Sequence, residues 1–341
     1  MNFQKKLDEL AKVIFAKRPQ LKEIVEKYGD ESLLEYSQRF RKNSNIVTSE
    51  LKHEFISEVT SYAQLYVDSK IITSIKRQLE NFYYLSTTDH MGVFGHPFFI
   101  HSTVLSALPF IERKNENHEN ILVLACSNIS LNNSSLPLSL TFHNKKNAEL
   151  EKISFFSSYN NNASVYGLRA FQPGDIKKIQ TTIEKKHHQK RYTKETTKKI
   201  ERLIKETYNR PDLFSYTYFS DQMNVTNSEV WKKLFQKSGK TPPNLVYLEQ
   251  ETLVLNLIKK HHLFSDTHLH KFLFNGEVAK KTKKNFNNIP GTFSIRKKTG
   301  TFLFWYLPSG NNRKVGLWRR GASLVSSDGK YKIPLKPEKI K

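Results

Sequence analysis

The segment that most constrains the fold is an uninterrupted apolar run, ENILVLACSN, at residues 119–128. A run of this length with polar residues at both ends is typical of a strand buried on both faces, as in a parallel sheet covered by helices. A short β-rich run (81–88), a loop, and a helical pattern that opens on Pro97 (97–114) precede it. Strand, loop, helix and strand at this spacing predict a right-handed βαβ unit with two parallel strands.

Helical patterns fill the chain before this unit. Apolar residues recur at three- and four-residue steps over residues 3–17, and further helical patterns cover 30–42 and 48–82. We therefore predict a helical N-terminal region at residues 1–80.

The chain after the unit alternates strands and helices up to residue 290. The predicted elements are, in order, two strands around an Asn–Lys turn within 138–158, a very basic helical stretch at 174–208, a helix from Asn227 or Ser228 to Gly239, and a strand at 245–248 that leads into a helix. From residue 291, short aromatic and β-branched runs alternate with turns at 299–300, 309–310 and 328–329, which predicts an antiparallel meander.

These patterns predict an α/β fold class. We expect a Rossmann-like, mostly parallel sheet with a helical N-terminal region and a small antiparallel β-rich C-terminal part. The predicted boundaries are 1–80 for the helical region, 81–290 for the α/β core and 291–341 for the β-rich part.

The charge of the chain indicates an anionic partner. Its 341 residues include 55 Lys and Arg against 32 Asp and Glu, a formal net charge of +23. Such a field attracts nucleic acid, anionic lipid headgroups or phosphorylated small molecules. Lysine far outnumbers arginine, whereas phosphate-binding proteins favour the bidentate arginine fork, so we prefer an anionic small substrate over nucleic acid.

The sequence predicts a cytoplasmic protein without a membrane span. The single cysteine, Cys126, rules out a disulfide within these residues and fits a reducing compartment. The opening residues are charged throughout and lack the apolar core of a signal peptide, and no run of about 18 apolar residues occurs. Because Cys126 lies in the apolar run, we expect its thiol to be inert core.

Polar side chains follow both strands of the predicted βαβ unit. Ligands bind to open α/β sheets at the carboxyl ends of the strands, so the loop 88–96 and the segment 127–135 should meet at one edge. The predicted site residues in these two segments are Thr88, Asp89, His90, Gly92, Gly95 and His96 from the loop, and Asn128, Asn132, Asn133 and Ser134 from the segment.

Each residue type has a chemical role there. His90 and His96 are predicted general acids or bases, and Asp89 would orient an imidazole or hold a cation. Gly92 and Gly95 would let the backbone approach a ligand, and the N–H groups near Pro97 would bind an anion. The Asn and Ser side chains would hydrogen-bond the substrate. In the alternative interpretation, the same residues only cap and shape a turn.

Three further places in the sequence contain residue types that could have a functional role. Glu249, at the end of the strand at 245–248, is a second candidate acid or base, with helix capping as the alternative. Arg319 lies in a β context with other arginines and Trp318, which suits a phosphate or a stacked base, with a solvated strand face as the simpler alternative. His261 and His262 stand beside lysines and are expected on a solvated helix end.

A divalent metal is an alternative cofactor for the loop. Asp89, His90, His96 and His101 supply ligand types that suit zinc or iron, but their spacings match no standard ligand pattern. The loop also lacks the glycine pattern of dinucleotide-binding and P-loop proteins, and the chain lacks a serine nucleophile elbow.

The segment GVFGHPFFIHS resembles the glycine–proline loop of the cysteine-adding enzymes of bacillithiol synthesis, which have a Rossmann-like core. The resemblance covers about a dozen positions. Asp89 and His90 stand where that family has paired glutamines, and the chain lengths differ, so no site residue is carried over.

We therefore expect an enzyme that acts on a polar, anionic small substrate by acid–base or group-transfer chemistry, as a transferase or hydrolase, with metal-assisted hydrolysis as one form. The alternative function is nucleic-acid binding through the basic segments 176–205 and 313–320.

Overall fold

The computed structural model divides into two compact units, Met1–Ser49 and Glu50–Lys341. The parallel sheet and all predicted site residues belong to the second unit. The structure describes residues 3–32, 35–36, 39, 49–80, 85–93, 100, 103–104, 107, 120–134, 136–144, 149–156, 163–236, 241–286, 305–308 and 314–339.

The first unit contains two helices, α1 (Phe3–Lys17) and α2 (Pro19–Tyr28). Helix α1 has the bounds that its apolar periodicity predicts. Leu10 and Val13 of its apolar stripe are 55% and 54% exposed, so the described residues do not bury the stripe.

A three-stranded parallel sheet lies at the centre of the second unit. Strands β1 (Leu85–His90), β2 (Asn120–Cys126) and β5 (Asn244–Glu249) follow the order β1-β2-β5. The predicted parallel pairing of the first two strands is confirmed. Strand β1, however, continues through Asp89 and His90, because these residues pair with Ala125 and Cys126 of β2. The prediction that they lie in a loop was wrong.

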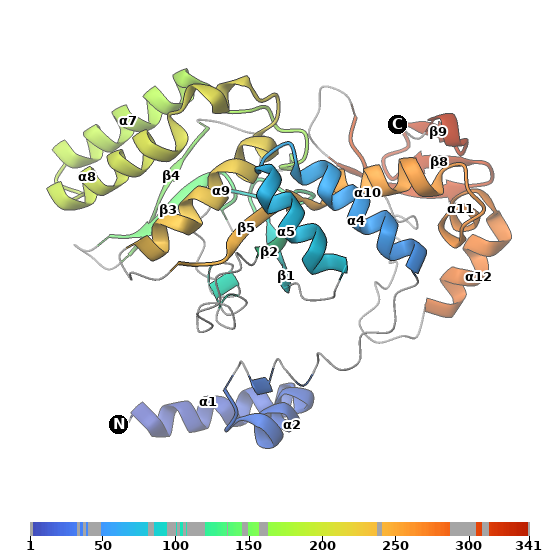
Figure 1. Ribbon diagram of the computed structural model, residues 1–341, viewed down its shortest axis with the longest axis horizontal. Helices are drawn as coiled ribbons and strands as arrows, with labels where there is room; N and C mark the ends of the chain where they lie inside the picture. The colour runs from blue at the N-terminus through green and yellow to red at the C-terminus, as the bar shows by residue number, and fades with distance from the viewer. Residues whose placement is uncertain are drawn as a thin grey trace. The chain divides into compact units, whose positions relative to one another are not determined.

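Helices α4 (Ser49–Ala63) and α5 (Ser69–Glu80) cover one face of this sheet (Figure 1). Val59 and Ile75 pack with Leu122 of β2 and Leu248 of β5 in one buried cluster. The sequence predicted a single helix here. The chain breaks after Ala63, and the Asp68 carboxylate accepts the Ile71 N–H at 3.0 Å to start a new helix.

Helix α9 (Phe219–Phe235) covers the opposite face, where Met223 and Trp231 join the cluster that contains Val123 and Tyr247. The sequence predicted that this helix begins at Asn227 or Ser228, which was wrong. The first turns of α9 are rich in polar residues, a composition typical of a loop, but these side chains are buried and hydrogen-bonded. Gln222, for example, accepts the Phe171 N–H at 2.9 Å and donates to the Leu213 carbonyl at 2.9 Å.

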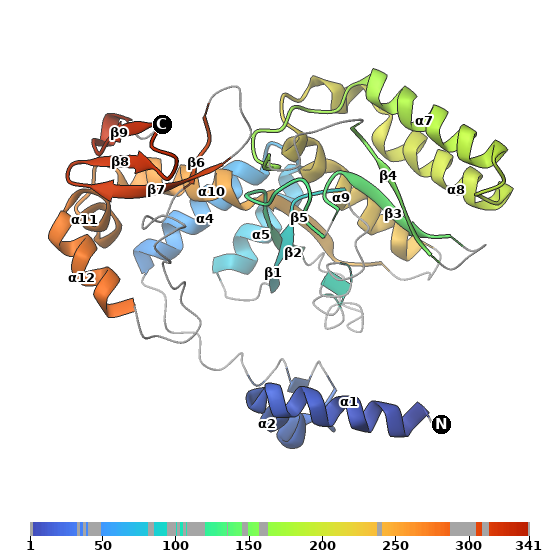
Figure 2. The same cartoon turned by 180° about the vertical axis from the view of Figure 1, so that it is seen from behind.

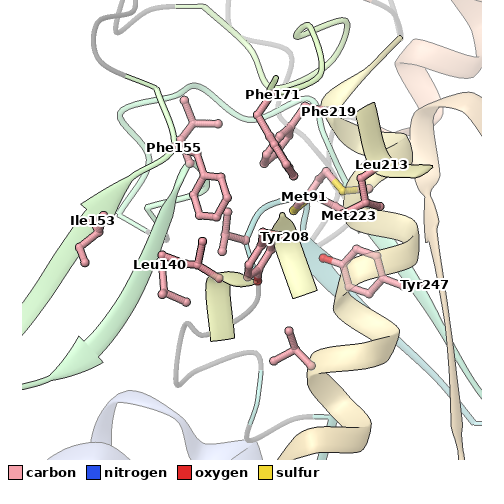
Figure 3. Packing of buried hydrophobic residues seen from close by; sticks show 14 of the residues in the cluster. Met91, Leu140, Ile153, Phe155, Phe171, Tyr208, Leu213, Phe219, Met223 and Tyr247 are labelled. Carbon is pink, nitrogen blue, oxygen red and sulfur yellow. The ribbon is translucent and has the colours of Figure 1, made fainter. Parts of the chain in front are cut away.

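The segment between β2 and α9 forms a second layer. Antiparallel strands β3 (Ser139–His143) and β4 (Leu150–Ser154) are confirmed. The basic helical stretch is a hairpin of α7 (Pro173–His188) and α8 (Lys194–Leu203), continued by a π-helix, η2 (Ile204–Tyr208), and a 3₁₀ turn, η3 (Pro211–Ser215). Figure 3 shows Phe155 beside Phe171 and Tyr208, with ring centroids 5.2 and 4.9 Å away.

The C-terminal part follows β5. It consists of α10 (Gln250–Leu257), the π-helix η5 (Ile258–His262), α11 (His268–Phe274), α12 (Gly276–Phe286), strands β6 (Trp305–Tyr306), β7 (Val315–Arg320), β8 (Ser323–Ser326) and β9 (Lys332–Pro334), and the short η6 (Pro337–Lys339). The four strands form the predicted antiparallel meander, seen beside α11 and α12 in Figure 2.

The predicted turn at 328–329 lies between β8 and β9, where Gly329 has φ +75°. The turns predicted at 299–300 and 309–310 lie outside the described residues. A mixed α/β structure with a parallel sheet is thus confirmed. Within the described chain, no helix combines the length and apolar character that crossing a membrane requires.

Candidate functional site

Asp89 and Glu249 lie at the carboxyl edge of the parallel sheet, on the two strands that flank β2. Asp89 pairs in register with Ala125, and Ala125 pairs with Glu249. Neighbouring strands are about 4.8 Å apart, so the two backbones are separated by roughly 10 Å. Residues at one register level share a face of a parallel sheet, so both carboxyl groups belong to the face that carries Tyr247 and α9.

The Asp89 carboxyl group is buried and held by two donors. The Tyr247 hydroxyl donates to Oδ2 at 3.0 Å, and the His90 N–H donates to Oδ1 at 2.6 Å. Burial raises the pKa of Asp89 to about 7, and the two hydrogen bonds lower it only in part. A carboxyl group with such a pKa changes its charge near neutral pH, which is the property that a general acid or base needs.

The Glu249 carboxyl group is more deeply buried, at 3% exposure. The Thr252 hydroxyl donates to Oε2. Burial raises the pKa of Glu249, and the Thr252, Ser127 and Ser220 hydroxyls partly oppose the rise. Within the described residues, Oε1 has no donor in full hydrogen-bond geometry. The side chain therefore keeps one oxygen for a proton or a ligand.

A second buried acceptor lies in the same neighbourhood. The Asn224 amide nitrogen donates to the Tyr62 hydroxyl at 3.4 Å, while the Asn224 Oδ1 has no partner among the described residues. Burial raises the pKa of Tyr62, and the charge of Glu249 adds to the rise. The Tyr62 hydroxyl is thus in contact with Asn224 and within the electrostatic range of Glu249, and each of these two residues has an acceptor oxygen without a hydrogen-bond partner in the described chain. Buried acceptors without partners are rare and call for an explanation.

Glu251 occupies the backbone N–H groups that follow β2. Its carboxylate accepts the N–H groups of Ser127 and Asn128 at 2.8 and 2.9 Å, together with the Ser127 hydroxyl at 3.0 Å. Because Glu251 already accepts both N–H groups, they are not available to a bound anion. Glu251 is not among the site residues predicted from sequence. Its position in the first turn of α10 was the available signal, because acidic residues are favoured there.

Cys126 and Lys314 complete this edge. The Cys126 thiol donates to Glu251 at 3.2 Å, and burial raises its pKa to about 12. The Lys314 ammonium donates to the Asn128 carbonyl and lies 4.8 Å from the centre of the Trp305 ring. Lys314 thus brings a cation from the C-terminal β-rich part to the end of β2.

Gly92 serves packing within the chain. A Cβ atom at this position would lie 2.6 Å from the Pro137 carbonyl oxygen, and the Val93 N–H bonds the same oxygen at 2.9 Å. The Gly92 carbonyl accepts the Asn227 amide at 3.0 Å. The close approach predicted for Gly92 is therefore made to Pro137.

The other residues of the predicted loop lie in different surroundings. His90 is partly buried at the end of β1. Thr88 pairs through its backbone with Leu124. Gly95 and His96 lie outside the described residues.

The segment 127–135 turns away from the strand end. The Asn133 N–H bonds the Ser130 carbonyl and the Leu136 N–H bonds the Asn133 carbonyl, both at 2.9 Å, so the residues between form a turn. Asn132 and Ser134 are exposed. Among the described residues, no hydrogen bond or ion pair joins the side chains of Asn132 and Ser134 to Asp89 or Glu249, although the sequence predicted one common site for these residues.

Arg319 lies on β7 and caps a helix. Its guanidinium donates to the Leu273 carbonyl at 2.7 Å and to the Phe274 carbonyl at 3.1 Å, at the end of α11. These contacts give the side chain a structural task, which the sequence analysis did not foresee.

His261 and His262 pack against α4 instead of pointing to solvent. His261 Nε2 lies 3.3 Å from the buried Glu58 carboxylate, and His262 Nε2 lies 3.6 Å from Glu54. The expectation of a solvated helix end was wrong for both residues. Over the part of the chain that the structure describes, no group of three or more His, Cys, Asp or Glu side chains could hold a metal ion. His96 and His101, two members of the predicted metal set, lie outside that part.

No protein-family model matches this sequence, and no curated protein matches it.

Proposed function

We propose that the chain is an enzyme that transfers protons to and from a polar small molecule at the carboxyl edge of a Rossmann-like sheet, with Glu249 as the principal acid–base group. The observation that supports this most is the Glu249 Oε1, which is buried and has no donor in full hydrogen-bond geometry among the described residues. In its neutral form the group would give its proton to a substrate atom that gains negative charge, and in its ionised form it would remove one.

Asp89 is the second acid–base group in this proposal. Its pKa, raised to about 7, allows both protonation states near neutral pH. The two carboxyl groups lie on one sheet face, on strands whose backbones are roughly 10 Å apart. They can therefore contact opposite sides of one small substrate. His90 and His96 were the histidines predicted for this role, and the carboxyl groups now have the stronger physical support, because burial shifts their pKa values toward neutrality.

The contacts also suggest what the substrate presents. Glu249 and Asn224 offer acceptor oxygens, so the reacting end of the substrate should bear a hydroxyl or amino donor. Lys314 uses one of its three N–H donors on Asn128, and the others are suited to a carboxylate or phosphate at the opposite end. A small molecule with a donor group and an anionic group, such as a hydroxy acid, an amino acid or a sugar phosphate, fits both ends.

A ligand screen by thermal unfolding tests this proposal. Wild type, Glu249→Gln and the exposed control Glu277→Gln would be melted with amino acids, hydroxy acids, sugar phosphates and nucleotides. A ligand at about ten times its Kd stabilises a protein by roughly 1.4 kcal/mol, or about 3–5 °C for a domain of this size. Glutamine keeps the Thr252 contact and the neutral charge of a protonated Glu249, so the variant should fold.

The proposal expects a compound that shifts the wild type and Glu277→Gln equally and shifts Glu249→Gln by less than half as much. Equal shifts in all three proteins, or no shift of the wild type by any of these compounds, would contradict it.

A further inference from the structure

The hairpin of α7 and α8 carries much of the positive charge of the chain. Residues 176–205 include eleven Lys and Arg and three Glu, a formal net charge of +8. The two helices lie side by side in both views (Figures 1 and 2). Their apolar residues Ile179, Ile183 and Ile200 are buried, so the basic residues occupy the outer surface.

Five of these residues are exposed and are called here the α8 stripe: Arg191, Lys194, Lys198, Arg202 and Lys205. Lys194, Lys198 and Arg202 lie on α8, whereas Arg191 precedes this helix and Lys205 lies in the π-helix η2 that follows it. The four-residue steps from Lys194 to Arg202 place these three residues on one helix face, in a row about 12 Å long. The opposite face of α8 holds the buried Thr197 and Ile200.

Most cations of the α8 stripe are not neutralised by the protein. Arg202 bonds Glu206 at 2.7 Å. Within the described ranges, the side chains of Arg191, Lys194, Lys198 and Lys205 make no ion pair. These four like charges lie within one short segment and repel one another, and a polyanion would relieve that repulsion.

The chemistry around the α8 stripe favours a duplex nucleic acid over other polyanions. A membrane-surface helix inserts apolar side chains between lipid headgroups, whereas the exposed neighbours on α8, such as Thr193, Glu195 and Lys199, are polar. Single-strand binders stack bases on exposed aromatic rings, and Tyr192, the aromatic residue of this segment, is buried. A duplex presents about one charge per 1.7 Å of axis and needs only cations for sequence-independent contact.

We propose that the α8 stripe binds the phosphate backbone of duplex nucleic acid without sequence preference. This surface is separate from the proposed acid–base site and does not depend on it. The second basic segment predicted from sequence, 313–320, adds little, because Arg319 is engaged with α11 and Arg313 lies outside the described residues.

Salt-dependent binding of the full chain tests this proposal. Fluorescence anisotropy would be measured with labelled DNA and RNA duplexes over a range of salt concentrations. One variant changes Arg191, Lys194, Lys198 and Lys205 to Gln. The matched control removes the same charge from four exposed lysines elsewhere, namely Lys280, Lys281, Lys284 and Lys332. Circular dichroism and thermal unfolding of both variants check that the fold is intact.

With four phosphate contacts, the slope of log K against log salt should be about −3.6 for wild type on DNA. The α8 stripe variant should bind at least tenfold more weakly with a much smaller slope, while the control stays within about twofold of wild type. Equal losses in both variants would show that only total charge matters and would overturn the proposal. Absence of duplex binding, or binding to anionic phospholipid vesicles instead, would overturn it as well.

Discussion

Substitution of Asp89 by Asn should make the protein more stable at neutral pH than the wild type. The Asp89 carboxyl group is buried, and burial raises its pKa from 3.8 to about 7. Asparagine has nearly the same shape and no charge. Its amide oxygen can accept the His90 N–H, and its amide nitrogen can donate to the Tyr247 hydroxyl, so both contacts seen with Asp89 have a replacement.

The sign and size of the effect follow from proton linkage. The native state of the wild type binds the Asp89 proton more tightly than the unfolded state does, so the contribution of this group to stability is complete below pH 3.8 and is lost as the pH rises to about 7. A shift from 3.8 to about 7 corresponds to roughly 4 kcal/mol at 1.36 kcal/mol per pH unit. The difference in unfolding free energy between Asp89→Asn and wild type should grow by that amount over this range.

Urea unfolding, followed by the fluorescence of the buried Trp231, measures this difference at several pH values. Asp266→Asn is the matched control, because the Asp266 side chain is 81% exposed. The free energy of Asp266→Asn should run parallel to that of wild type at every pH. If the curve of Asp89→Asn also ran parallel to that of wild type between pH 4 and 7, the buried carboxyl group would not have the pKa on which the site depends.

Four further results are expected. Gly92→Ala should lower the unfolding free energy by roughly 1–3 kcal/mol, measured in urea, because the new Cβ would lie 2.6 Å from the Pro137 oxygen; unchanged stability would contradict this packing. Glu251→Ala should cost roughly 3 kcal/mol in the same assay, since two backbone N–H groups lose a charged acceptor, and Glu251→Gln should cost less. Arg319→Met should speed amide hydrogen exchange at the end of α11, whose carbonyls it caps, and an unchanged rate would remove that role. Cys126 should react with iodoacetamide at pH 8 far more slowly than an exposed cysteine, because its pKa is raised to about 12.

The parallel sheet could be predicted because its signal is local. The apolar run of β2 is long, continuous and bounded by polar residues, and only burial on both faces explains such a run. Helix boundaries were less accessible. The apolar periodicity of 48–82 does not show that Asp68 caps a new helix, and the polar first turns of α9 look like a loop until Gln222 meets the backbone of Phe171.

Part of the candidate site could also be predicted, because the ends of the strands can be recognised in the sequence. The carboxyl-edge rule for parallel strands places Asp89 and Glu249 together from strand positions alone. The partners that set their chemistry are far away in sequence. Tyr247 reaches Asp89 across the sheet, and Asn224 on α9 contacts Tyr62, whose pKa the charge of Glu249 helps to raise. Such contacts depend on tertiary packing and leave no spacing pattern to read.

The ionisation of Glu249 tests the central claim most directly. The side-chain carboxyl carbons of glutamate would be labelled with ¹³C, the signal of Glu249 would be assigned by its loss in Glu249→Gln, and its chemical shift would be followed against pH. Because burial raises the pKa of this group, its signal should titrate above the ordinary glutamate range. A titration within that ordinary range would show a solvated carboxylate, and the proposed acid–base role of Glu249 would be contradicted.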